Sequence, residues 1–284
     1  MGNTIQDKAM LVNLRISQWT ARKYDRDATA TVEAHYNTAG AGRFNKALIA
    51  QSALKEVQQA ANALRTYHYT QTLPWTDDNY RLLASANFLP YTERVRELTS
   101  VFDLASNYVI TNYSALVEDA RTTLNGMFNA RDYPTDIRER YGVNVDIVPV
   151  PSGEDFRVAL QNGELERIKS DIDTRTQERV ENAHRDLYRR LAETVSRIAE
   201  RLSHPTAIFR DTLISNLREL CETIPRLSII DDPELEALRR DAENKLCNVD
   251  AQDLREDPDL RTATAVNANG VLAAMEGLYG NSDS

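Results

Sequence analysis

The sequence predicts a mainly helical α+β protein, an elongated bundle of long helices with a small three-stranded sheet. First, residues 164–204 contain no glycine or proline. Second, apolar residues recur along this segment about every 3.7 positions, which is the period of a helix with one buried face. Third, three short segments elsewhere alternate apolar and polar residues, as half-buried strands do.

The segment 164–204 is predicted to be a single long helix. At 1.5 Å per residue it reaches about 60 Å, whereas a globule of this chain length is about 40 Å across. Its apolar stripe must therefore be covered by the other predicted long helix, 91–128, or by a partner protein or second copy. On the opposite face acids precede arginines by four residues, as Asp186 precedes Arg190. This face is interpreted as a solvated, salt-bridged surface, with a docking surface as the alternative. The expected interface residues are Leu187, Leu191, Val195 and Ile198.

The remaining elements follow from local patterns. Alternation predicts strands at 12–16, 143–147 and 156–160, which we expect to pair as one sheet. A further helix is predicted at 47–69. Asp-Pro pairs at 232–233 and 257–258 begin two more helices, because proline suits the first helical position. We expect an N-terminal α+β region at 1–162 and a helical region at 163–284, which together form one continuous unit.

Composition narrows the class of protein. The 284 residues carry a net charge of −9, which disfavours bulk coating of nucleic acid. No apolar run is long enough to span a membrane, and no signal-peptide pattern is present. We therefore expect a cytoplasmic protein. Cys221 and Cys247 are interpreted as reduced structural residues, with a disulfide as the alternative.

No segment carries a catalytic signature, so we do not assign an enzyme activity. His184-Arg185-Asp186 matches a kinase catalytic triplet in its letters, but it lies in the middle of a predicted helix. Gly40-Ala41-Gly42-Arg43 lacks the lysine and hydroxyl of a phosphate-binding loop. No two of the four histidines have metal-ligand spacing on one helix face. No metal or cofactor is expected. An enzyme with an unrecognised site remains the alternative.

The N-terminal segment mixes aromatic and basic residues. Bases stack on aromatic rings while cations hold phosphates, so this mixture is typical of single-strand binding. The alternative is that the tryptophan packs in the core while the cations stay solvated. The candidate nucleic-acid-binding residues are Trp19, Arg22, Lys23, Arg26, Arg43 and Lys46.

Several runs resemble a family of unknown function from phages and integrative mobile elements. They are residues 16–25, 42–48 and 67–77, together with 155–158 and 208–220. The resemblance covers nearly the whole chain and implies no activity or catalytic residues. It implies a bacterial host cell and a genetic setting beside a MoxR- or CobS-like AAA+ ATPase and a von Willebrand A-type protein, sometimes among recombination genes.

We therefore expect a non-enzymatic helical adaptor or scaffold that self-associates or binds a protein partner, with an AAA+ ATPase as the candidate partner. The alternative is a DNA-binding accessory protein in recombination or DNA processing, which would use the basic N-terminal segment. No membrane partner is expected.

Overall fold

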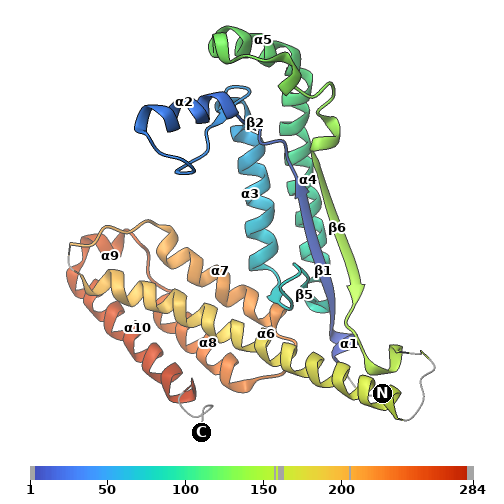
Figure 1. The fold of residues 1–284 in the computed structure, drawn as a ribbon. Coiled ribbons are helices and arrows are strands. Elements are labelled where there is room, and N and C mark those ends of the chain that lie inside the picture. Colours follow the sequence, from blue (N-terminus) through green and yellow to red (C-terminus); the bar gives the residue numbers. More distant parts are fainter. Residues whose placement is uncertain (1–3, 157, 159–162, 205, 280–284) are drawn as a thin grey trace. The chain divides into compact units, whose positions relative to one another are not determined.

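The computed structural model describes residues 4–156, 158, 163–204 and 206–279 (Figure 1). In these residues helices predominate, and the strands form a four-stranded sheet and a two-stranded ribbon. The predicted fold class, mainly α with a small amount of β structure, is confirmed.

The chain divides into two compact units. Unit 1 comprises residues 1–13, 69–90 and 147–284, and unit 2 comprises residues 14–68 and 91–146. This division does not follow the predicted boundary at residue 162, because segments from the N-terminal half belong to unit 1. Each of the four crossings between the units lies inside a helix or strand.

Unit 1 is built around α6 (Glu164–Ser203), the predicted long helix, which is 40 residues long. Figure 1 shows α6 in yellow with the red helix α10 (Pro258–Tyr279) running beside it. Both α10 and α7 (Thr212–Leu227) pack along α6, and α8 (Pro233–Leu246) packs against α7 and α10. The short helices α1 (Ile5–Lys8) and α9 (Asp253–Glu256) complete the unit.

The helix starts of unit 1 follow the predicted signals. Asp232 caps α8, since its Oδ1 accepts from the backbone N–H groups of Glu234 and Leu235 at 2.8 and 3.1 Å. Asp257 makes the same contacts at the start of α10. The predicted inward residues of α8 are all buried; they are Leu235, Leu238, Ala242 and Leu246.

The four-stranded sheet has the order β4-β5-β1-β6. The two predicted strands near residues 14 and 145 are confirmed as the neighbours β1 (Ala9–Ser17) and β6 (Gly142–Pro149). The strands β4 (Leu73–Pro74) and β5 (Arg81–Ala84) were not predicted. β5 pairs antiparallel with both β4 and β1, which places Leu82 opposite Leu11.

The predicted third strand at 156–160 is wrong for the residues described. Phe156 and Val158 are not in a strand, and 157, 159 and 160 lie outside the described residues. The preceding turn is held against α6 instead, because the Gly153 N–H donates to Asp173 Oδ1 at 2.8 Å. A Cβ atom at Gly153 would lie 2.7 Å from the Lys169 carbonyl oxygen, so this contact requires glycine.

Unit 2 contains the ribbon and four helices. Strand β2 (Arg22–Tyr24) pairs antiparallel with β3 (Asn45–Ala47). The predicted helix 47–69 begins later than expected, as α3 (Lys55–Thr70), because its first residues form β3 and a 3₁₀ turn. The predicted helix 91–128 is divided at Asn112. The remaining helices are α2 (Arg26–Tyr36), α4 (Phe88–Thr111) and α5 (Tyr113–Leu124).

Candidate partner-binding surfaces

The predicted interface on the long helix does not form a surface. Leu187, Leu191, Val195 and Ile198 are each 0% exposed and belong to the core of unit 1. The helices α7, α8 and α10 pack on α6 within the same unit, so the chain covers this stripe itself. The prediction of an open apolar strip at these four residues is therefore wrong. The predicted helix 91–128 is not the cover, since all of it belongs to unit 2.

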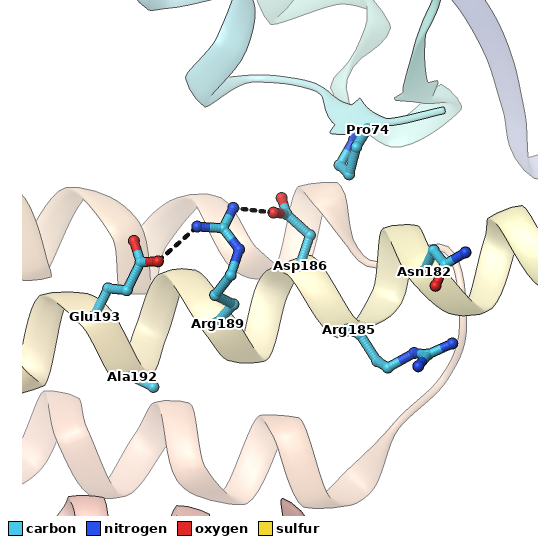
Figure 2. Close-up of a pocket in the computed structure, with 7 residues that line it drawn as sticks. All are labelled: Pro74, Asn182, Arg185, Asp186, Arg189, Ala192 and Glu193. Carbon is cyan, nitrogen blue, oxygen red and sulfur yellow. Dashed lines mark hydrogen bonds and ion pairs between the residues drawn. The ribbon is translucent and has the colours of Figure 1, made fainter. Parts of the chain in front are cut away.

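The exposed side of α6 carries a shallow groove of about 520 Å³ beside Pro74 (Figure 2). Arg189 forms ion pairs with Asp186 and with Glu193, the latter at 2.7 Å. These pairs occupy three of the four charged side chains that line the groove, and Arg185 is the fourth. The groove thus fits the solvated, salt-bridged reading of this face.

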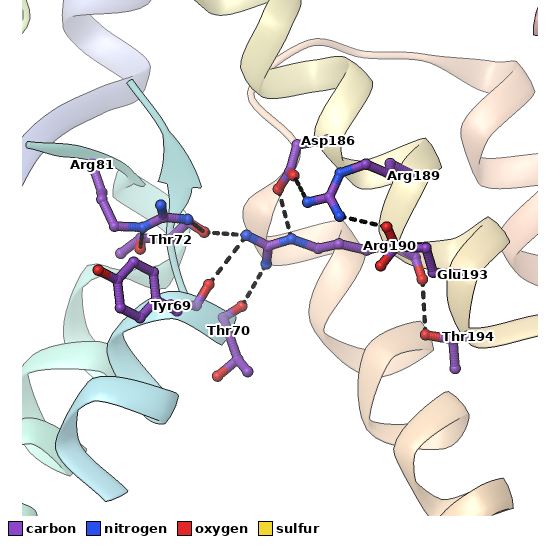
Figure 3. A network of polar contacts seen from close by, with 9 residues as sticks. All are labelled: Tyr69, Thr70, Thr72, Arg81, Asp186, Arg189, Arg190, Glu193 and Thr194. Atoms are coloured by element: carbon purple, nitrogen blue, oxygen red, sulfur yellow. Dashed lines mark hydrogen bonds and ion pairs between the residues drawn. The ribbon is translucent and has the colours of Figure 1, made fainter. Parts of the chain in front are cut away.

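A network of polar contacts joins α6 to the end of α3 (Figure 3). The Arg190 guanidinium donates to the carbonyl oxygens of Tyr69, Thr70 and Thr72 at 3.1, 2.9 and 2.6 Å. These carbonyls lie at or just beyond the C-terminus of α3, where a cation offsets the helix dipole. Asp186 Oδ2 accepts from Arg190 Nε at 2.6 Å, as the acid-before-base spacing predicted.

Arg81 extends this network from β5. Its Nε donates to Thr72 Oγ1 at 2.7 Å, and its guanidinium lies 4.7 Å from the centre of the Tyr69 ring. Burial lowers the pKa of Arg81 to about 10, with the nearby Arg190 charge adding to the effect. The network is structural, because the hydrogen bonds described here run from the two arginines to the chain's own carbonyls, to a carboxylate and to the Thr72 hydroxyl.

Two of the three residues that match a kinase triplet, His184 and Asp186, have structural roles. His184 Nε2 lies 2.6 Å from Asp232 Oδ2, which also accepts from the Tyr188 hydroxyl at 2.5 Å. Burial would raise the pKa of Asp232, but the hydrogen bonds from Tyr188, His184 and the α8 backbone outweigh it and lower this pKa to about 2. The cluster therefore holds the Asp232 cap ionised at the start of α8.

The predicted nucleic-acid-binding residues divide into two groups. Lys46 is buried and forms ion pairs of 2.9 Å with both Asp25 and Asp132. Burial would lower the pKa of Lys46, but its hydrogen bonds with Asp132 and Asp25 raise it. Trp19 is half-buried and packs edge-to-face on Tyr113. Lys46 and Trp19 are therefore structural, and the prediction that they contact nucleic acid is not supported by their burial.

The other basic residues are exposed on or beside the ribbon. Arg22 and Lys23 lie on β2, and Arg26 begins α2. Arg22 and Tyr24 share one face of the strand, since side chains alternate. The Arg43 guanidinium lies over the Tyr24 ring at 5.8 Å from its centre. Tyr24 itself is 44% exposed, so cations and an accessible aromatic ring occur together here.

A second surface lies on α4 and was missed at the sequence level. Val101, Leu104 and Tyr108 are 53%, 73% and 62% exposed. Their spacing of three and four places them within about 60° of one another round the helix. The buried residues that the sequence did predict, including Phe102 and Val109, lie on the other side of α4. Apolar residues on two faces of one helix were the signal that would have found this surface.

The two units also differ in net charge. Unit 2 contains fourteen Lys and Arg against thirteen Asp and Glu, whereas unit 1 contains twenty against thirty. Unit 1 therefore has a net charge of −10 and unit 2 of +1. The bulk charge is thus no argument against an anionic partner at unit 2, because exposed charges more than about 10 Å apart are largely screened.

These features define a mainly helical protein with two exposed surfaces on unit 2, one apolar and one basic. No protein-family model matches the chain, and neither does any curated protein or solved structure. Among the described residues, no group of three or more His, Cys, Asp or Glu could hold a metal ion. No described helix is both long enough and apolar enough to cross a bilayer.

Proposed function

We propose that the protein is a non-enzymatic adaptor that binds a partner protein through the exposed apolar stripe of α4. The observation that supports this proposal is the stripe formed by Val101, Leu104 and Tyr108. Single exposed apolar residues are common and need no explanation. Three large ones in a row on one helix are the pattern by which helices recognise apolar grooves.

The occupant that fits this stripe is an apolar groove or helix of another protein. Tyr108 supplies a large apolar body with a hydroxyl group, which suits a partly hydrated interface. The resemblance to the phage and mobile-element family stays a prediction, and within it an AAA+ ATPase is the candidate partner. A second copy of the chain is the competing occupant.

Site-specific photo-crosslinking tests this proposal. The photoreactive residue p-benzoylphenylalanine replaces Leu104 in one variant and its neighbour Asp103 in a matched control. Asp103 is also exposed but points about 100° away round α4. We expect an adduct from position 104 in host cells and none from position 103, with mass spectrometry identifying the partner.

The adduct must also depend on the stripe itself. Adding Val101→Glu to the Leu104 crosslinking variant places a charge in the same contact, so we expect the adduct to disappear. Equal labelling from positions 103 and 104 would show that α4 has no partner. An adduct whose mass is twice that of the chain would identify a second copy as the occupant instead.

A second candidate function is single-stranded nucleic-acid binding at the ribbon. The specific support is the exposed set of Arg22, Lys23, Arg26 and Arg43 beside the Tyr24 ring. Cations that hold phosphates beside a ring on which a base can stack are the components of such a site. The corresponding binding measurement is described in the Discussion.

A further inference from the structure

The two cysteines of the chain meet where α7 packs on α8. Cys221 lies on α7, and Cys247 is the residue that ends α8. The Cys221 thiol donates to the Arg239 carbonyl oxygen at 3.8 Å. Arg218, one turn before Cys221, donates to the Cys247 carbonyl oxygen at 2.7 Å. Arg239 in turn donates from Nη1 to the Cys221 carbonyl oxygen at 3.4 Å, so the two helices are tied together beside both cysteines.

We propose that Cys221 and Cys247 are a redox-active thiol pair, which a peroxide oxidises to a disulfide that joins α7 to the end of α8. From the sequence alone these residues were interpreted as reduced structural cysteines, with a disulfide as the alternative. Both cysteines are buried where the two helices pack, and Arg218 and Arg239 link the helix backbones beside them. This placement makes the pair a candidate modification site.

The two thiols are not equivalent. Cys247 is 7% exposed, whereas Cys221 is 0% exposed, so a small oxidant reaches Cys247 first. The neighbouring Cys221 thiol lowers the pKa of Cys247 against the effect of burial, and the charge of Arg218 lowers it further. The neighbouring Cys247 thiol and burial raise the pKa of Cys221. Because the thiolate is the nucleophile, Cys247 is the residue that reacts with peroxide.

The reaction balances with hydrogen peroxide as the oxidant. The Cys247 thiolate attacks one peroxide oxygen, the O–O bond breaks, and the leaving hydroxide takes a proton to form water. The product is a sulfenic acid on Cys247. Cys221 then loses its proton and attacks the Cys247 sulfur, which breaks the S–O bond and releases a second water. Two thiols and one peroxide thus yield one disulfide and two waters.

A disulfide here would close the chain between the middle of α7 and the end of α8. The covalent link restricts the unfolded chain, so the oxidised protein should melt at a higher temperature than the reduced one. A thiol reductant such as dithiothreitol should reverse both the bond and the shift.

Peptide mapping of the full chain tests the proposal. The folded protein is treated with hydrogen peroxide, remaining thiols are blocked with N-ethylmaleimide, and the product is digested with trypsin. We expect peptides 219–226 and 246–255 to be joined by a disulfide in the monomer. Two blockable thiols after treatment, or a disulfide between two copies, would overturn the proposal.

Two serine variants test the order of events. In Cys221→Ser the reaction should stop at the sulfenic acid of Cys247, which dimedone traps. In Cys247→Ser the buried Cys221 should resist peroxide under the same conditions. Equal dimedone labelling of the two variants would contradict the assigned roles. The wild-type peptide map decides the proposal alone if either variant fails to fold.

Discussion

Arg190 donates a 2.6 Å hydrogen bond to the carbonyl oxygen of Thr72, a residue 118 positions earlier in the chain. The Arg190 side chain is only 16% exposed and makes its other contacts with Asp186 and with carbonyls near the end of α3. A single guanidinium thus satisfies several backbone acceptors that the end of a helix leaves open.

Arg190→Ala should therefore lower the free energy of unfolding by about 3 kcal/mol, because it leaves the carbonyl of the buried Thr72 and part of the Asp186 charge unpaired. Arg189→Ala is the matched control, since Arg189 pairs with the same carboxylate but is 56% exposed. Its loss should cost less than about 1 kcal/mol. Urea denaturation measures both values. Similar losses in the two variants would contradict the structural role assigned to Arg190.

The burial of the α6 stripe leads to a paired prediction on two leucines. Leu191→Asp places a charge in the core of unit 1 and should cost more than about 4 kcal/mol, which is most of the stability of a domain at the low end of the usual range. Leu104→Asp, on the exposed stripe of α4, should leave the thermal melting curve almost unchanged. Circular dichroism measures both melting temperatures. A folded Leu191→Asp protein with altered mass in light scattering would restore α6 as an interface.

Single-strand binding at the ribbon makes a prediction on charge. Replacing Arg22, Lys23 and Arg26 with Ala should weaken binding of an oligonucleotide and reduce the salt slope by up to about two, at roughly 0.7 per lost phosphate contact. The control removes three exposed arginines elsewhere on unit 2. Fluorescence anisotropy across a salt series gives both slopes. Absence of wild-type binding near 50 mM salt would exclude this function. The control arginines are Arg94, Arg96 and Arg138.

The lowered pKa of Asp232 predicts a dependence of stability on pH. Its folded value of about 2 lies below the ordinary value of 3.8, so the ionised carboxylate stabilises the fold. This contribution is complete above pH 3.8 and is lost as the pH falls through about 2. Asp232→Asn should therefore be destabilising at pH 6, and its difference from wild type should shrink toward pH 2. A constant difference in urea denaturation across that range would rule out the linkage.

The helices were predictable because their signals are local. The absence of glycine and proline gives α6, and Asp-Pro pairs give the starts of α8 and α10. These patterns act within a few residues of one another, so tertiary contacts did not override them. The β1–β6 neighbours were also found, since each strand is long enough to show alternation.

The failures share a cause, which is dependence on distant residues. β4 has two residues and shows no alternation, so its place beside β5 is decided by packing. Lys46 reads as a surface cation, and only the fold brings Asp132 to it. The cysteine pair depends in the same way on how α7 lies on α8. Of the two candidate surfaces, the exposed arginines of the ribbon were predictable from the sequence. Predicting the apolar surface of α4 would have required knowing which of the two apolar sides of this helix is buried.

The interleaving of the two units has a consequence for synthesis on the ribosome. Unit 2 is complete once residue 146 has emerged, but unit 1 must wait for the 138 residues that follow. At typical elongation rates this delay is about 7 to 28 s. During that interval the apolar side chains of residues 9–13 and 81–84 have no core in which to pack. They therefore stay exposed, where chaperones and other nascent chains can bind them. Slowing translation beyond residue 146 should therefore increase aggregation of this protein.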